Sequence, residues 1–273
     1  MEFDLQSIGL MALILIAAGA VAGLLAGLLG IGGGVVIVPV LIEFFALAGV
    51  QEDVRMHLAV GTSLATIVAT SMSSIRSHHK RDGVDWPLWR LLGPSIAVGV
   101  VIGTLLASQS PGRVLALTFA VVALASAVYL IIFPDGVRQG QMRPGLPIVG
   151  GSGIIIGAVS TMIGIGGGTM SVPTLVMFGT PIRRAIGTSA ALGLIIAVFG
   201  CVGFMIAGYG DPRLPPLSLG YVSLLGFAAL VPMTVAMAPL GARLAHSLPP
   251  MLIKRLFAGF LIIAAVRLLV SNL

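Results

Sequence analysis

Two copies of one glycine-rich run, each set in a long apolar stretch, constrain this chain more than any other feature of its sequence. The run Gly-Ile-Gly-Gly-Gly covers residues 30–34 and again 164–168, and Val-Pro follows both times, at 38–39 and 172–173. Each glycine costs roughly 1 kcal/mol relative to alanine in a helix interior, so four in five positions predict a break in the helix. Inside a membrane, such irregular backbone has to be surrounded by protein or by a water-filled cavity.

The composition assigns the chain to the helical membrane proteins. Hydrophobic residues make up 58% of the 273 residues and charged residues only 9%, and the mean hydropathy is +1.12. Such a chain has too few polar groups to cover a globular surface. Its apolar stretches lack the polar and apolar alternation of membrane barrel strands. We therefore expect an all-α polytopic membrane protein, in which the lone Cys201 leaves no internal disulfide.

About ten apolar segments are long enough to cross a bilayer, or to enter it and return. They cover 8–29, 35–48, 58–75, 88–107, 114–133, 147–163, 169–179, 185–207, 217–240 and 251–270. A helix of about 20 residues spans the hydrocarbon core of roughly 30 Å. The segments that follow the two glycine runs are shorter than this, so we predict half-helices there.

The second half of the chain repeats the first. The glycine runs lie 134 positions apart, and Gly-Thr-Ser occurs at 61–63 and again at 187–189. Each half contains five segments, which is an odd number, so the second half is expected to lie inverted relative to the first. We predict a first repeat of five segments at 1–133, a cytoplasmic linker at 134–146 and a second, inverted repeat at 147–273. Inverted repeats with broken helices are typical of secondary transporters.

The basic residues set the expected orientation, because cytoplasmic loops carry an excess of Lys and Arg. Eleven fall on one side of the predicted segments and four on the other. The eleven are Arg76, Lys80, Arg81, Arg90, Arg138, Arg143, Arg183, Arg184, Arg243, Lys254 and Arg255, and the four are Arg55, Arg113, Arg213 and Arg267. We expect a multi-pass protein of the cytoplasmic (inner) membrane with both termini on the extracytoplasmic side. The net charge of +6 then reflects orientation and predicts no nucleic-acid partner.

The early glycine runs, the Val-Pro that follows them and the later Gly-Thr-Ser resemble the TauE/SafE family, also called sulfite exporters or the TSUP family. The resemblance covers essentially the whole chain. It implies a permease of the cytoplasmic membrane that moves sulfur-containing anions such as sulfite or organosulfonates.

The glycine runs also suggest a binding chemistry of their own. A helix that begins directly after a run presents unpaired N–H groups and about half a positive charge, which together form a cradle for an anion. Inverted symmetry places the two cradles at one depth, and hydroxyls nearby would complete the site. The candidate substrate-binding residues are Gly32, Gly33, Gly34, Thr62, Ser63, Gly166, Gly167, Gly168, Thr169, Thr188 and Ser189.

Each of these features has an alternative interpretation. The glycines also permit close helix packing, and the Gly-Thr-Ser hydroxyls also suit helix capping or interhelical hydrogen bonds. The cargo is alternatively another small organic anion, or the chain is a membrane assembly factor without cargo. An enzyme is not expected, because dinucleotide loops need a soluble strand–helix unit with an acidic residue, and the apolar segments show no paired carboxylates or Ser-His arrangement.

Two ionisable residues are candidates for coupling transport to protons. Glu43 lies within the first short segment, where an acid is a functional candidate, and His57 precedes the next segment, where histidine is a side chain suited to carrying a proton. His78 and His79 are interpreted as part of a cytoplasmic basic loop. The expected partners are thus a small anionic solute, the lipid bilayer and protons, and we expect no cofactor and no metal site.

Overall fold

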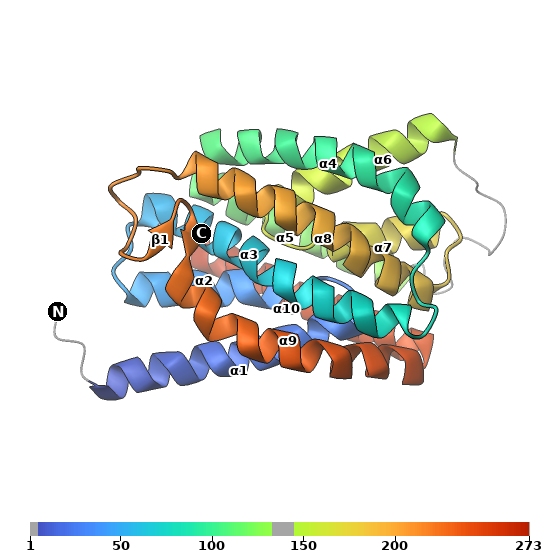
Figure 1. The fold of residues 1–273 in the computed structure, drawn as a ribbon, viewed down its shortest axis with the longest axis horizontal. Helices are drawn as coiled ribbons and strands as arrows, with labels where there is room; N and C mark the ends of the chain where they lie inside the picture. The colour runs from blue at the N-terminus through green and yellow to red at the C-terminus, as the bar shows by residue number, and fades with distance from the viewer. Residues whose placement is uncertain (1–4, 133–144, 273) are drawn as a thin grey trace.

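The described part of the chain forms a helical bundle with one small hairpin (Figure 1). This computed structural model describes residues 5–132 and 145–272. Most of the predicted linker at 134–146 therefore lies outside the described residues. The helices are α1 (Leu5–Leu29), α2 (Gly34–Leu47), α3 (Glu52–His79), α4 (Trp86–Gln109), α5 (Gly112–Ile132), α6 (Leu146–Met162), α7 (Gly168–Met177), α8 (Ile182–Ala207), α9 (Leu224–Ser247) and α10 (Pro250–Asn272). The strands β1 (Ser218–Leu219) and β2 (Val222–Ser223) pair antiparallel between α8 and α9.

The prediction of an all-α polytopic membrane protein is confirmed. Within the described residues, five helices are long and apolar enough to cross a bilayer, namely α3, α4, the first 18 residues of α5, α8 and α9. Large apolar side chains cover the outside of the bundle, and Val121 and Ile206 are 65% and 71% exposed. Water would not tolerate so much apolar surface on a monomer, whereas lipid does.

Helices α2 and α7 are half-helices, as the sequence predicts. They contain 14 and 10 residues, and even the longer one extends only about 21 Å, which is less than the hydrocarbon core. Each half-helix begins inside the bundle, directly after a glycine run, and turns back against the helix before it. The pairs α1–α2 and α6–α7 are therefore helical hairpins whose bends are the two glycine runs.

The ninth segment differs most from its predicted bounds. The sequence predicts a helix over 217–240, but α9 runs from Leu224 to Ser247. Leu217 has a positive φ of 60°, and the β1–β2 hairpin occupies the residues that follow. The Ser223 hydroxyl then caps α9 by accepting a hydrogen bond from the Gly226 amide at 3.2 Å. The shift places His246 inside the last turn of α9.

Glycines let two helix pairs approach with their backbones in contact. Helix α1 packs along α9, and α6 packs along α4. Gly19 and Gly23 of α1 leave no room for a Cβ against the backbone of α9, and Gly153 and Gly157 of α6 leave none against α4. Small residues at such interfaces are typical of membrane helices. Helix α3 also contacts α8, and α5 contacts α10.

Candidate functional site

The two glycine breaks meet each other in the middle of the bundle. A Cβ added at Gly32 would lie 3.5 Å from the Cα of Gly166. Gly34 packs against the carbonyl of Gly164, and Gly168 packs against the backbone of Ile31. Both runs are fully enclosed by protein, so the irregular backbone lies where a membrane tolerates it.

Each half-helix starts from a glycine with a left-handed backbone, a conformation that residues with a Cβ rarely adopt. Gly33 caps α2 with a φ of 86°, and Gly167 caps α7 with a φ of 79°, and neither cap is satisfied by a side chain. The start of α2 at Gly34 lies against the α6–α7 hairpin, and the start of α7 at Gly168 lies against the α1–α2 hairpin. The start of a helix is the positive end of its dipole. The arrangement can hold a negative charge without a cationic side chain.

Each glycine break is hydrogen-bonded by one serine of a Gly-Thr-Ser motif from the opposite half of the chain. The Ser63 hydroxyl on α3 donates to the carbonyl of Gly164 at 2.8 Å. The Ser189 hydroxyl on α8 donates to the carbonyl of Gly30 at 3.1 Å. Both hydroxyls are buried, so the two hydrogen bonds form a reciprocal tie between the hairpins and the central helices.

The threonines of the same motifs fix the starts of two other helices. Thr62 accepts a hydrogen bond from the backbone N–H of Ser223 at 2.9 Å, and Thr188 accepts one from the N–H of Asp85 at 2.8 Å. Ser223 and Asp85 are the N-caps of α9 and α4. All four motif hydroxyls thus have partners within the protein, and any contact with a ligand requires an exchange of these hydrogen bonds.

Several other buried hydroxyls have no such partner among the described residues. Thr169, the second residue of α7, is one of them, and Ser171 is another. Both are fully enclosed. A buried polar group without a hydrogen bond costs about 1–3 kcal/mol, and such groups are therefore candidate contacts for a ligand or water. Sequence reasoning selected Thr169 but missed Ser171.

A second polar stripe, which sequence reasoning also missed, runs along α3. Ser71 and Ser74 are buried and lack a partner within the described chain. They share one helix face with Ile67, which packs on Gly32, and with His78. The spacing of four, three and four positions could have indicated this buried face in the sequence.

His78 is enclosed and is not part of a loop, so that interpretation is wrong. Helix α3 continues to His79, and His78 is 0% exposed. Its Nε2 lies 2.8 Å from the carbonyl of Gly27, so this nitrogen carries the hydrogen. Its Nδ1 lies 3.2 Å from Nε2 of His246 on α9. His78 therefore connects α3 and α9 to the end of α1, three residues before the first glycine run.

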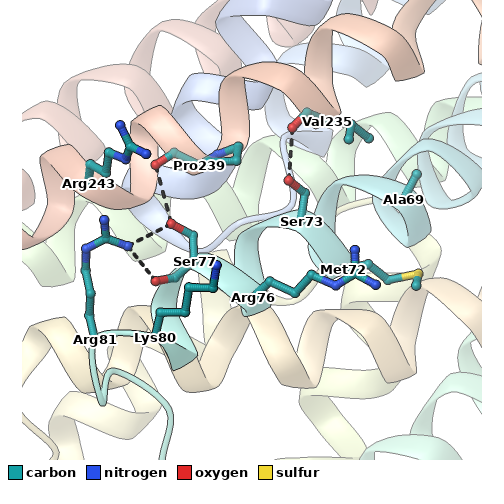
Figure 2. Close-up of a pocket in the computed structure, with 10 residues that line it drawn as sticks. All are labelled: Ala69, Met72, Ser73, Arg76, Ser77, Lys80, Arg81, Val235, Pro239 and Arg243. Carbon is teal, nitrogen blue, oxygen red and sulfur yellow. Dashed lines mark hydrogen bonds between the residues drawn. The ribbon is translucent and has the colours of Figure 1, made fainter.

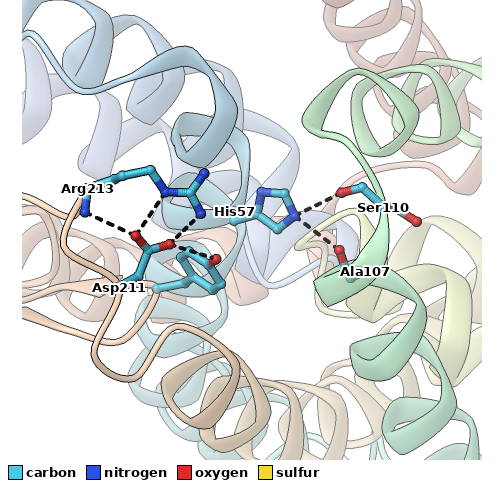
Figure 3. Close-up of polar contacts among 6 residues, drawn as sticks. His57, Ala107, Ser110, Asp211 and Arg213 are labelled. Atoms are coloured by element: carbon cyan, nitrogen blue, oxygen red, sulfur yellow. Dashed lines mark hydrogen bonds and ion pairs between the residues drawn. The ribbon is translucent and has the colours of Figure 1, made fainter.

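His57 is buried at the opposite end of α3 (Figure 3). Its Nε2 lies 3.0 Å from the carbonyl oxygen of Ala107 and 3.1 Å from that of Ser110. Because carbonyls only accept, Nε2 is the donor. The ring lies 5.2 Å from the ring of Tyr221, while Nδ1 has no partner among the described residues. His57 fixes the end of α4 and retains one nitrogen for a proton.

A charged pair in the loop after α8 lies beside this histidine. Tyr221 donates its hydroxyl to Asp211 at 3.3 Å, and two guanidinium nitrogens of Arg213 donate to the same carboxylate at 2.9 and 2.6 Å. The hydrogen bond from Arg213 holds the pKa of Asp211 at about 2, below its ordinary value. The pair remains charged at all physiological pH values.

Glu43 lies away from the glycine breaks. Its side chain is 50% exposed, and it approaches Arg267 of α10 at 3.7 Å. An exposed ion pair of this kind contributes about 0–1 kcal/mol to stability. Glu43 also lines a cavity of about 560 Å³ together with Asp53 and Arg113, at the end of α3 that carries His57.

The serine ties give a first testable prediction. Ser63→Ala and Ser189→Ala should each lower the free energy of unfolding by about 1–3 kcal/mol, because a buried glycine carbonyl loses its donor. Thermal unfolding of the purified protein in detergent measures this effect. Ser108→Ala is the control, because that hydroxyl is exposed and bonds only within its own helix. Unchanged melting of both variants would contradict the reciprocal tie.

Comparisons with known proteins identify relatives across nearly the whole chain. The family model "Sulfite exporter TauE/SafE" matches residues 15–268. A probable membrane transporter protein of Haemophilus influenzae is 39% identical over 252 residues, which covers 92% of this chain and 95% of the relative. A probable membrane transporter protein of Methanocaldococcus jannaschii is 28% identical and covers 82% and 80%. No solved structure matches significantly.

Proposed function

The chain belongs to the sulfite exporter TauE/SafE family of membrane proteins, and from this premise we propose that it carries a small sulfur-containing anion, such as sulfite or an organosulfonate, across the cytoplasmic membrane. Transport as such is supported by the relatives, which are named probable membrane transporters. The observation that carries the proposed site is the meeting of two glycine breaks at the starts of α2 and α7.

The anion binds, in this proposal, between the two helix starts. Backbone N–H groups of Gly32, Gly33, Gly34, Gly166 and Gly168 provide the donors, and that of Gly167 joins them when its present hydrogen bond to the carbonyl of Ile165 at 2.6 Å exchanges. The hydroxyl of Thr169 adds a donor that has no partner among the described residues. Ser63 and Ser189 bond the carbonyls of Gly164 and Gly30, and with the adjacent Thr62 and Thr188 they are proposed to join the ligand shell when their present hydrogen bonds exchange. Binding by dipoles and hydroxyls alone is weak enough to release the cargo.

Alternating access follows from the proposed inverted repeats. The residues of both breaks are buried in this structure, so the proposed cycle requires them to open to each side of the membrane in turn. The packing of α1 on α9 resembles that of α6 on α4, and the serine ties are reciprocal. Both observations support two equivalent halves, residues 1–133 and 147–273, that move against each other. Loss of the Ser63–Gly164 hydrogen bond would release the α6–α7 hairpin from α3, and loss of the Ser189–Gly30 hydrogen bond would release the α1–α2 hairpin from α8.

Orientation and energy source complete the proposal. Arg81, Arg183 and Arg243 lie at the end of the bundle that carries His78, and this basic end is proposed to face the cytoplasm. Both termini are then extracytoplasmic.

Protons are the proposed coupling ion. His57 is the better supported carrier, because it is buried and its Nδ1 has no hydrogen-bond partner in the part of the chain that the structure describes, whereas Glu43 is half exposed.

Uptake into proteoliposomes tests the proposed function. We expect saturable uptake of sulfite or of an organosulfonate such as taurine or sulfoacetate, stimulated by a pH gradient, and no saturable uptake of chloride. Uptake of sulfate and of thiosulfate, measured in the same way, defines the selectivity among sulfur-containing anions. Uptake of a non-sulfur organic anion in place of these would support the alternative cargo. A protein that transports none of them, and whose melting temperature no anion changes, would instead act as an assembly factor.

A further inference from the structure

A groove lies between α3 and α9, on a face that the glycine site does not use (Figure 2). Its volume is about 430 Å³. One wall is the face of α3 from Ala69 to Ser77 together with Lys80 and Arg81 just beyond the end of the helix, and the other is α9 from Val235 to Arg243. In Figure 1, this part of α3 runs at the front of the bundle between α8 and α9, both of which it contacts. The groove is therefore a surface feature of the bundle.

One end of the groove is strongly basic. Lys80, Arg81 and Arg243 lie at this end, whereas the Arg76 side chain extends along the groove toward Met72 (Figure 2), and none of the described lining residues is acidic. Arg81 is partly committed, because its Nη1 donates to the carbonyl of Ser77 at 2.7 Å and to the hydroxyl of Ser77 at 3.0 Å. Within the described residues, the side chains of Arg76, Lys80 and Arg243 have neither a hydrogen bond nor an ion pair. This end consequently attracts an anion.

The other end of the groove is apolar. Ala69, Met72 and Val235 line it, and Met72 is 46% exposed although it lies well inside a candidate membrane span. The two hydroxyls of the groove are satisfied within the protein, since Ser73 donates to the carbonyl of Val235 at 2.9 Å and Ser77 donates to that of Pro239 at 3.5 Å. This half of the groove thus offers a ligand mainly apolar contact.

We propose that the groove binds one anionic phospholipid. The phosphate lies beside Lys80 and Arg243, at the end of the helices where headgroups are found, Arg76 turns toward it from the α3 wall, and an acyl chain lies along Met72 and Val235. A free oxyanion would use only the basic end and would leave the apolar end empty. A neutral lipid would leave three cations without a counter-charge. Basic pockets between membrane helices are suited to anionic headgroups for the same reason.

Lipid-dependent thermal unfolding of the purified full-length protein tests this proposal. Phosphatidylglycerol added to the detergent micelles should raise the melting temperature by several degrees, because a ligand that binds only the folded state stabilises it. Phosphatidylcholine and inorganic phosphate at the same concentration should not. The double variant Arg76→Gln, Arg243→Gln should need at least about tenfold more phosphatidylglycerol for the same shift. Its melting temperature without lipid should be unchanged, because both side chains are exposed and have no hydrogen bond or ion pair with any residue that the structure describes.

Arg90→Gln is the matched control, since Arg90 is also an exposed arginine but does not line the groove. It should respond to phosphatidylglycerol as the native chain does. Native mass spectrometry of the same samples should retain one phosphatidylglycerol on the native chain and none on the double variant. Equal shifts with phosphatidylcholine, an unchanged response in the double variant, or stabilisation by inorganic phosphate that the double variant loses would each overturn the lipid assignment.

Discussion

Valine in place of Gly33 or Gly167 should reduce anion uptake by roughly 100-fold or more while the protein still inserts into the membrane. Both glycines have left-handed backbones, and a non-glycine residue in a sparsely populated region costs about 1–3 kcal/mol. A Cβ at Gly33 would lie 2.9 Å from the carbonyl oxygen of Ala22, and one at Gly167 would lie 2.5 Å from Ile196. Because about 1.4 kcal/mol corresponds to a factor of ten in rate, distortion of the cradle by twice that amount gives the expected loss.

Initial rates of uptake into proteoliposomes, normalised to the reconstituted protein, measure the effect. Gly259→Val is the control, because a Cβ at Gly259 meets nothing within 4 Å, and its transport should equal that of the native chain. Membrane fractionation checks insertion of each variant. Normal uptake by either Gly33→Val or Gly167→Val would exclude the cradle in that half of the chain.

Leucine in place of Gly23 or Gly157 should have the largest effect on stability. A Cβ at Gly23 would lie 2.6 Å from the Cα of Thr234, and one at Gly157 would lie 2.9 Å from the amide nitrogen of Val100. Backbone atoms cannot rotate away as side chains do, so the helices have to separate. Overpacking of this kind costs about 1–3 kcal/mol and occasionally more, and we expect the upper end, which lowers the melting temperature by about 10 °C.

Thermal unfolding and the yield of monodisperse protein in detergent measure this loss. Gly150→Leu in α6 serves as the control, because a Cβ there has open space. The two variants should be similarly damaging, since Gly23 and Gly157 occupy equivalent positions, 134 residues apart, in the two proposed repeats. A severe defect in one and native behaviour in the other would argue against equivalent packing of the halves.

The sequence alone was sufficient to predict a helical membrane protein and the positions of the two glycine breaks. The bilayer requires apolar helices of about 20 residues, so the segments are visible in composition alone. Glycine lowers helix stability locally, and α1 accordingly ends at Leu29, with α2 beginning at Gly34. The predicted end of α3 at residue 75 was wrong by four residues, because the polar residues up to His79 remain helical.

The roles of individual polar side chains depended on contacts between distant parts of the chain. Ser63 and Gly164 are 101 positions apart, and Ser189 and Gly30 are 159 apart. No local periodicity encodes such a pair. The burial of His78 likewise results from α1 and α9 closing around the end of α3, although its own sequence neighbours are charged.

The sequence by itself therefore determined that this chain is a helical membrane protein with two broken helices, since lipid and glycine act on each residue wherever it lies in the fold. Only the tertiary structure decided that the breaks pack on each other, that the motif serines tie them to the opposite half, and that three unpaired cations share a groove with apolar residues. These relations arise when helices far apart in the sequence bury their faces together, and hydrogen-bond partners follow from that packing.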